Sequence, residues 1–378
     1  MPATPTTIRS LRVQHLDIPL WESFGISGGT QQIAKNLLVT IELADGKRGY
    51  GEAAPFPSFN GETQQMAFDA INATKTLLEG ADVWQWRSLI KQIRQCTNGV
   101  GSAQCALETA ILDALTLHSK MPLWAFFGGN STQLETDMTL PIPSVGSEQD
   151  SIEHAANFTR YITGNGIKTI KIKVGGDLNA DIKRIEAVHA QAPQAALILD
   201  GNAGYETPEA ALNLLESLAQ NNIIPILFEQ PTPKDDLNAL RTLTESTNVP
   251  IAADESAHNL NSVRRIIDEK AANVVNIKLM KFGIVEALDV AALCRAANIG
   301  LMIGGMVESP LSMTVSASFA AGIGGFTYID LDTPFFMQSI PLKGGCYHTD
   351  TTSGEERIQV TPTLDLRSIT QGHGVTPH

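Results

Sequence analysis

The chain of 378 residues predicts an α/β protein, a modified (β/α)7β barrel of the TIM type with an N-terminal α+β capping domain that the C-terminal segment completes. Two observations predict this fold. Beyond about residue 131, short apolar segments alternate with helical stretches, and most of these segments are apolar on both faces, which is typical of parallel strands covered by helices. No GxGxxG or GxxxxGK[ST] pattern follows the first strand, which argues against an open nucleotide-binding sheet.

The first predicted unit spans residues 1–130. Residues 8–53 have a strand pattern with a turn at Asp45-Gly46, which indicates a small antiparallel meander. From about residue 63 the apolar positions recur at steps of three and four, and this helical pattern ends near Pro122. An α+β cap therefore precedes the barrel.

The predicted barrel spans residues 131–338. Eight strand candidates lie in it: DMTLPIPS, TIKIKVG, ALILDGNAGY, ILFEQP, PIAADES, VVNIKLMKFG, IGLMIGGMVES and FTYIDLDT. Residues 339–378 show no helical period, and we expect them to pack back on the cap.

Composition excludes several classes of protein. The net charge is −13 and no basic run occurs, so nucleic acid is not an expected partner. The start has no signal-peptide pattern and no run reaches the about 18 apolar residues of a membrane span, so we expect a cytoplasmic protein that does not bind membranes. Its four cysteines have no CxxC spacing and fall among apolar residues, which indicates buried free thiols.

Polar residues interrupt the apolar strands near their C-terminal ends, where barrels of this class carry their active sites. Asp200, Glu229 and Asp254 fall on three successive strands and should converge at one side of the barrel mouth. Oxygen ligands without nearby His or Cys favour Mg²⁺, with Mn²⁺ as a possible substitute. The alternative is that these acids form salt bridges to lysine inside the barrel.

Lysines are expected on both sides of this site. Lys171 and Lys173 share one strand face, and Lys278 lies on a strand across the barrel. Desolvation and neighbouring cations should lower their pKa, so Lys173 and Lys278 could exchange a proton from opposite faces of one carbon. Lys281 falls on the opposite strand face from Lys278 by the same alternation, so we expect it to reach solvent or a helix.

The order KxK, DxN, EQP, DES and NIKLMK resembles the enolase superfamily, specifically its muconate-lactonising branch with a lysine pair, and is most similar to the dipeptide epimerases that include Ala-Glu epimerases. LMIGGMVES contains no histidine, unlike the branch with a histidine base on that strand. The resemblance implies an isomerase that inverts the α-carbon of a dipeptide's C-terminal residue by proton transfer between Lys173 and Lys278, through an enediolate stabilised by one Mg²⁺ per site. It also implies a homo-oligomer.

The resemblance assigns further residues. Asp330 and Asp332 are similar to the DxD pair that holds the substrate's α-ammonium group, and two anions there also favour a cationic substrate end on physical grounds. Lys171 would contact the substrate carboxylate, and Thr139 and Gly305 would line the site. The last group of residues would orient the lysines or the metal ligands: Asn202, Glu255 and Glu308.

Specificity should differ from that of Ala-Glu epimerases. The first cap loop, WESFGISGGTQQ, has no arginine for a glutamate side chain and places Gly28-Gly29 near that position. The cap loops offer three phenylalanines and an acid, consistent with an apolar or a cationic side chain: Phe24, Phe56, Phe59 and Glu22.

Alternatives stay open at this point. Within the same branch they are an N-acylamino-acid racemase, a cycloisomerase and an o-succinylbenzoate synthase. From other classes, a metal-dependent hydrolase could use the three carboxylates to activate water, and a non-catalytic barrel could bind a small ligand.

Overall fold

The computed structural model describes residues 4–26, 29–142, 147–175, 177–350 and 356–378. The chain begins with an antiparallel sheet of β1 (Ile8–Ile26), β2 (Gly29–Leu43) and β3 (Arg48–Ala53), in that order. The β2–β3 hairpin turns at Gly46, whose φ of 85° suits glycine. The predicted meander is confirmed.

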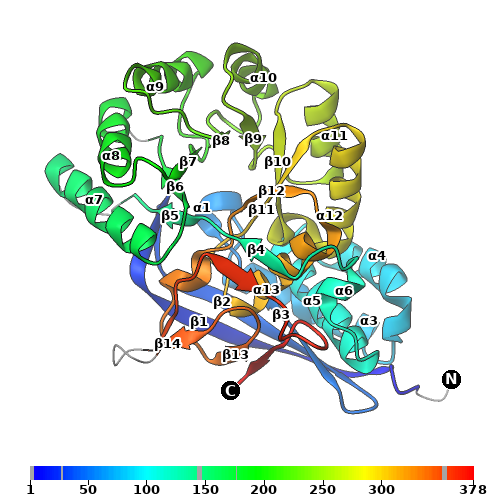
Figure 1. The fold of residues 1–378 in the computed structure, drawn as a ribbon. Coiled ribbons are helices and arrows are strands. Elements are labelled where there is room, and N and C mark those ends of the chain that lie inside the picture. Colours follow the sequence, from blue (N-terminus) through cyan, green and yellow to red (C-terminus); the bar gives the residue numbers. More distant parts are fainter. Residues whose placement is uncertain (1–3, 27–28, 143–146, 176, 351–355) are drawn as a thin grey trace.

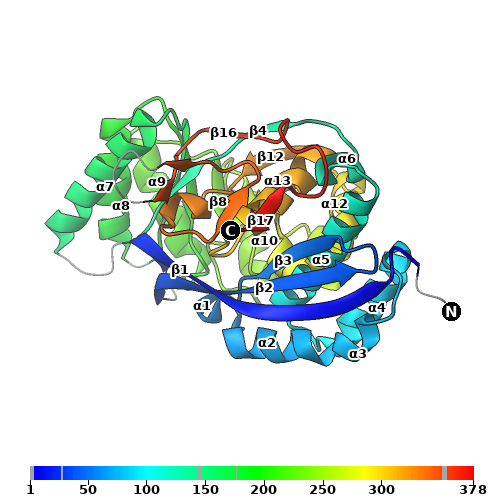
Figure 2. The same ribbon diagram turned by 90° about the horizontal axis from the view of Figure 1, so that it is seen from below.

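Helices cover one face of this sheet (Figure 2). They are α1 (Pro57–Asn60), α2 (Gln64–Ala73), α3 (Lys75–Leu78), α4 (Trp86–Cys96) and α5 (Gly101–His118), with a 3-10 turn at Val83–Gln85. The short α6 (Leu123–Phe126) follows α5 and packs against a helix of the barrel, α13 (Pro310–Ile323). The long α5 lies directly on β3, because Gly49 and Gly51 have no side chain to hold it away. A Cβ at Gly51 would lie 2.0 Å from the carbonyl oxygen of Ala106.

The second part is an eight-stranded parallel sheet that curls into a barrel (Figure 1). Its strands are β5 (Met138–Leu140), β6 (Thr169–Lys173), β7 (Ala196–Asp200), β8 (Leu227–Glu229), β9 (Ile251–Ala253), β10 (Val274–Lys278), β11 (Gly300–Gly304) and β12 (Phe326–Ile329). One helix follows each of the first seven strands, in the order α7 (Glu148–Gly164), α8 (Leu178–Gln191), α9 (Pro208–Gln220), α10 (Leu237–Ser246), α11 (Leu260–Asp268), α12 (Leu279–Ala296) and α13 (Pro310–Ile323). The predicted (β/α)7β fold is confirmed.

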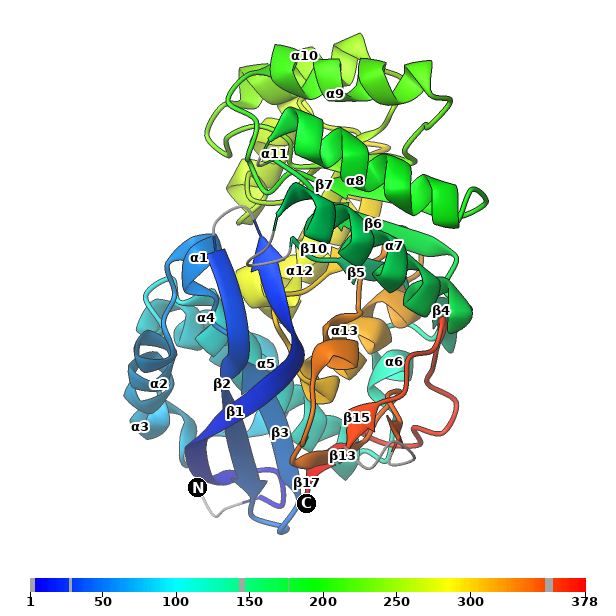
Figure 3. The same cartoon turned by 90° about the vertical axis from the view of Figure 1, so that its left-hand side faces the viewer.

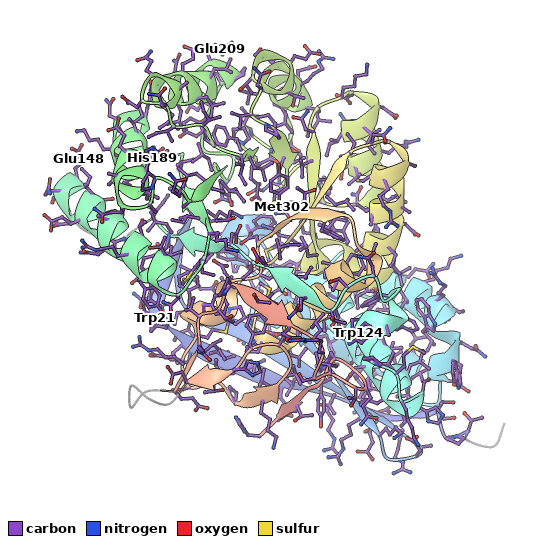
Figure 4. The ribbon with its side chains drawn as sticks, in the orientation of Figure 1. Trp21, Trp124, Glu148, His189, Glu209 and Met302 are labelled. Atoms are coloured by element: carbon purple, nitrogen blue, oxygen red, sulfur yellow. The ribbon has the colours of Figure 1, made fainter. Side chains whose placement is uncertain are left out.

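The two edge strands of this sheet meet. The backbone N–H of Asp137, just before β5, donates to the carbonyl of Ile329 at the end of β12 over 2.9 Å. Apolar side chains fill the lower part of the barrel, and Figure 4 shows Met302 of β11 inside it, whereas Glu148, His189 and Glu209 lie on the outer helices. Charged side chains end several of the strands, namely Lys173 in β6, Asp200 in β7, Glu229 in β8 and Lys278 in β10.

The cap reaches the barrel through the end of its β1–β2 hairpin (Figure 3). The amide of Ile142 donates to the carbonyl of Gly25 over 3.4 Å, and the indole of Trp21 donates to the carbonyl of Phe335 over 2.8 Å. Phe335 belongs to a 3-10 turn, η2 (Thr333–Phe336), that follows β12. These contacts place the hairpin over the barrel mouth.

The C-terminal residues form short strand pairs. They are β13 (Leu342–Gly344) with β17 (Val375–Pro377), β14 (Thr349–Asp350) with β15 (Arg357–Ile358), and β16 (Thr363–Asp365) with β4 (Gln133–Glu135). The segment also contacts the cap, since the amide of His373 donates to Asp113 of α5 over 2.9 Å. The boundaries expected at residues 130 and 338 stay predictions.

All four cysteines are free, as expected, but Cys96 is exposed and the prediction of burial was wrong for it. Cys96 is the last residue of α4, and that end of the helix faces solvent. Within the described part of the chain, no helix has the length and apolar character needed to cross a membrane.

Replacing Gly51 by alanine should lower the free energy of unfolding by about 1–3 kcal/mol, because the new methyl group forces β3 away from α5. The matched control is Gly164→Ala at the end of α7, where a Cβ meets no atom within 4 Å and the change should be neutral or stabilise by about 1 kcal/mol at most. Urea unfolding of both variants measures the difference. Equal stabilities would contradict the close packing of β3 on α5.

Candidate active site

The parallel register brings the predicted residues to one level of the barrel. Lys173 of β6 pairs with Asp200 of β7, and Asp200 pairs with Glu229 of β8. Asp254 directly follows β9, and Lys278 ends β10. Each of these five side chains is buried. The sequence alternation thus predicted correctly which residues face the interior.

Lys171 lies at the centre of this group. Its Nζ is 2.6 Å from Asp330 Oδ2, 2.7 Å from Glu229 Oε2 and 2.9 Å from Asp200 Oδ2. Burial alone would lower the pKa of Lys171, but the three carboxylates raise it well above its ordinary value. Lys171 is therefore a fixed positive charge.

Lys173 and Lys278 face each other across the mouth, because three strands separate β6 from β10 in the sheet. Lys173 Nζ is 2.6 Å from Asp200 Oδ2, and Lys278 Nζ is 2.6 Å from Asp254 Oδ2. The ring of Phe59 lies 4.6 Å from Lys278 Nζ.

The expected lowering of the Lys278 pKa is not found. Burial disfavours the charge of Lys278, but Asp254 and then Glu229 raise its pKa above the ordinary value. The prediction weighed desolvation and neighbouring cations and left out this direct ion pair with a carboxylate.

The three predicted metal ligands are fully buried. Burial and the neighbouring Asp200 raise the pKa of Glu229 to about 7, and Asn276 Nδ2 donates to Glu229 Oε1 over 2.6 Å. Burial would raise the pKa of Asp254, but Lys278 and Lys281 lower it to about 2. Lysines contact one oxygen of Asp200, one oxygen of Glu229 and both oxygens of Asp254, as the salt-bridge alternative predicted.

The prediction for Lys281 was wrong. Lys281 Nζ lies 2.6 Å from Asp254 Oδ1 and 3.0 Å from the carbonyl of Asn276, and its side chain is buried. The strand ends at Lys278 and the chain turns into α12, so the alternation of strand faces does not extend to Lys281. This lysine gives Asp254 a second ammonium partner.

The substrate residues expected from the resemblance line one cavity between the cap and the barrel. Its walls include the two lysines of the proposed proton transfer and the following residues: Thr139, Lys171, Gly305, Asp330, Asp332, Asn202, Phe24, Phe56, Phe59, Met306 and Thr333. Burial and the neighbouring Asp330 raise the pKa of Asp332 to about 7.

Asn202, Glu255 and Glu308 were expected to orient the lysines or the metal ligands, and each makes different contacts. The backbone N–H of Asn202 donates to Asp200 over 3.1 Å, and its side chain donates to Glu255 over 3.2 Å. Burial and then Asp254 raise the pKa of Glu255 to about 8. Glu308 instead accepts hydrogen bonds from the Met306 amide at 2.7 Å and from Ser312, so it holds the β11–α13 loop.

The cap loops are apolar where they meet the cavity. Phe24, Phe56 and Phe59 line it, whereas Glu22 lies 3.6 Å from His154 and is absent from the described lining. Of the Gly28-Gly29 pair, Gly28 lies outside the described residues.

Sequence reasoning missed Asn276, Met306 and Asp137. Asn276 had a signal, because it is a polar residue two positions before Lys278 on an apolar strand and therefore shares its face. Met306 and Asp137 lie just outside strands, where alternation gives no guidance.

Two family models match the chain, one over the cap and one over the barrel and the C-terminal segment. Residues 9–128 match the family model described as mandelate racemase / muconate lactonizing enzyme, N-terminal domain. Residues 153–377 match the model described as enolase C-terminal domain-like. Together the two models cover most of the chain.

Among curated proteins, an "aromatic dipeptide epimerase" of Herpetosiphon aurantiacus is 47% identical over 98% of this chain and 99% of its own length. A "hydrophobic dipeptide epimerase" of Citrifermentans bemidjiense is 34% identical over 95% of each chain. Among solved structures, a dipeptide epimerase of Enterococcus faecalis in complex with Mg and L-Leu-L-Tyr has a TM-score of 0.88 and 30% identity, over 98% of this chain and 100% of that one.

Replacing Lys171 by methionine should lower the free energy of unfolding by about 3–5 kcal/mol at neutral pH, because three buried carboxylates lose a shared cation. The control is Lys168→Met, one step before β6, where an exposed lysine pairs with exposed Glu135 and the cost should be about 1 kcal/mol or less. Urea unfolding without divalent cations compares them. A Lys171 variant as stable as the control would contradict the central role of this ion group.

Proposed function

Since the chain belongs to the mandelate racemase / muconate lactonizing enzyme family with its enolase-like C-terminal domain, we propose that it is a Mg²⁺-dependent dipeptide epimerase. The reaction inverts the α-carbon of the C-terminal residue of a dipeptide. Full-length relatives named as dipeptide epimerases support this proposal.

One observation carries the mechanism. Lys173 and Lys278 project into the same cavity from β6 and β10, on opposite sides of the barrel mouth. An α-carbon held between them has one lysine on each face. One lysine removes the α-proton, and the other returns a proton to the opposite face, so the configuration inverts.

The donor set fits a hard divalent cation. Asp200, Glu229 and Asp254 are buried carboxylates on adjacent strands, and no histidine or cysteine lies among the described lining residues. Mg²⁺ bound there would neutralise the carboxylates that pair with Lys173 and Lys278 and stabilise the negative charge that develops on the substrate carboxylate.

The rest of the site orients the dipeptide. Lys171, a fixed cation, binds the substrate carboxylate from the side of β6. Asp330, which pairs with Lys171, and Asp332 bind the α-ammonium group. Thr139 and Gly305 line the space between. These contacts at both ends hold the α-carbon between the two lysines.

The side chain of the epimerised residue is apolar in this proposal. Phe24, Phe56 and Phe59 face the cavity, whereas Glu22, the acid that suggested a cationic side chain, pairs with His154 instead. Relatives described as acting on aromatic and hydrophobic dipeptides support the same preference.

Other members of the branch remain second candidates. An N-acylamino-acid racemase or a cycloisomerase would not need two buried carboxylates opposite the metal ligands, so Asp330 and Asp332 favour the dipeptide. A metal-dependent hydrolase leaves the opposed lysines without a role. The expectations of a cytoplasmic location and a homo-oligomer belong to this proposal, and light scattering tests the latter.

The proposal predicts α-proton exchange in D₂O. With Mg²⁺ and an L,L-dipeptide that ends in an apolar residue, proton NMR should show loss of the C-terminal α-proton signal. Lys173→Ala and Lys278→Ala should each lower epimerisation by about 10²–10⁴-fold, because each removes the acid–base group on one face. Each variant should exchange at most one of the two epimers.

Lys168→Ala, which removes an exposed lysine near β6, is the control and should keep wild-type rates. Exchange with N-acylamino acids but with no dipeptide would move the assignment to the racemase. Hydrolysis without exchange would move it to the hydrolase.

Mg²⁺ should also stabilise the fold. At a concentration a hundredfold above Kd it should add about 2.7 kcal/mol to the free energy of unfolding, seen as a higher Tm. Glu229→Gln and Asp254→Asn should abolish this response. Asp113→Asn, a buried carboxyl of the cap, should keep it. A response that survives in both ligand variants would place the cation elsewhere.

A further inference from the structure

A third acidic side chain lies beneath the Asp330–Asp332 pair. Asp137 directly precedes β5, two residues before Thr139, and is 2% exposed. Within the described residues, neither of its carboxylate oxygens has a hydrogen-bond partner. A buried carboxylate with no donor is costly, so this residue needs an explanation.

Asp137, Asp330 and Asp332 form one cluster. One oxygen from each lies within 4.8 Å of the others, and all three side chains are buried. Asp330 has a cation, since its Oδ2 lies 2.6 Å from Lys171 Nζ. Asp332 accepts the amide of Thr139 through Oδ2, but its Oδ1 has no partner among the described residues.

Few charges can balance this cluster. Lys171 of β6 is the cation that pairs with the cluster, and the same ammonium group also contacts Asp200 and Glu229. The other titratable groups that face it are Glu229 of β8 and Tyr347 of the C-terminal segment, whose hydroxyl donates to the Leu331 carbonyl at 2.6 Å. Three ionised carboxylates would leave an excess of negative charge in a dry site.

Buried carboxyl groups this close commonly share a proton. Burial, then Asp330 and Asp332, raise the pKa of Asp137 well above its ordinary value, in agreement with the geometry. The cavity lining includes Asp330 and Asp332 but does not include Asp137. Asp137 can therefore affect the substrate only through this pair.

We propose that Asp137 keeps a proton in the Asp137–Asp330–Asp332 cluster of the substrate-free protein, and that the cluster releases this proton to solvent when a substrate ammonium group binds to Asp330 and Asp332. Asp137 is thus a positioning residue that sets the charge of the ammonium site. The inference rests on the proposed function, because it needs a substrate with an ammonium end.

The consequence is competition between a proton and the substrate ammonium. Between pH 6 and 7.5 the dipeptide amine stays largely protonated, since its ordinary pKa is about 7.7–8.0. KM should therefore fall as pH rises over this range, by up to about tenfold per pH unit where the cluster is protonated, while kcat changes independently. In Asp137→Asn this dependence of KM should be lost, and KM at pH 6 should be lower than in the wild type.

The direct test measures protons. Mg²⁺-loaded full-length protein at pH 6.5 in weak buffer with an indicator dye receives a saturating L,L-dipeptide. The wild type should release about one proton per site, and Asp137→Asn none. A desamino dipeptide, which lacks the ammonium group, should release none from either protein. Asp137→Ser is the second variant if the asparagine variant does not fold.

An infrared spectrum of the substrate-free protein gives a readout that is independent of activity. The protonated-carboxyl absorption of the wild type at pH 6.5 should lose the contribution of one carboxyl group in Asp137→Asn and should be unchanged in the control Asp113→Asn. Equal proton release by wild type and Asp137→Asn overturns the inference and leaves the epimerase intact. If the wild type binds two Mg²⁺ and Asp137→Asn binds only one, the inference is also overturned, because the cluster would then hold a cation and not a proton. No exchange by the wild type with any dipeptide overturns the proposed function itself.

Discussion

The structure depends on one group of buried charges, in which Lys171 contacts carboxylates from three different strands. Asp200, Glu229 and Asp330 come from β7, β8 and the end of β12, so one ammonium group connects distant parts of the sheet. Such a group is tolerated in a dry interior only when each charge keeps a partner. A register shift of one residue on β6 would turn Lys171 and Lys173 toward the helices, so the pairing of the strands is held strictly.

Two further ion pairs hold the lysines that face each other. Asp200 pairs with Lys173 and Asp254 pairs with Lys278, which keeps both lysines at the level of the barrel mouth. Residues with no part in proton transfer hold the carboxylates in turn. Asn276 donates to Glu229, and Lys281 to Asp254. Both lysines therefore stand on strands with their own supporting contacts, which in the proposed reaction would limit their movement relative to a bound α-carbon.

Period-two alternation and strand order were sufficient to predict the barrel, the three carboxylates and the two lysines, because interior faces of parallel strands follow directly from the sequence. What alternation could not provide is where a strand stops. Lys281 was misplaced because β10 ends three residues earlier, and Asp137 was missed because it precedes β5. The raised pKa of Lys278 needed the distance to Asp254, which no pattern contains.

The cap supplies the aromatic side chains of the cavity, whereas the barrel supplies its lysines and carboxylates. Trp21 stacks on Phe336 with ring centroids 6.1 Å apart, and Phe24 meets the same ring edge-on at 5.5 Å. Phe336 belongs to η2, which begins directly after Asp332. The aromatic wall of the cavity and the acidic pair are therefore attached to one another, whereas the lysines stand on β6 and β10. Aromatic packing joins the hairpin to η2, but rings of the cap also reach the two lysines. The ring centroid of Phe24 lies 5.8 Å from Lys173 Nζ, and that of Phe59 lies 4.6 Å from Lys278 Nζ. Substitutions of these phenylalanines would therefore change both the apolar wall that meets the substrate side chain and the surroundings of the lysines.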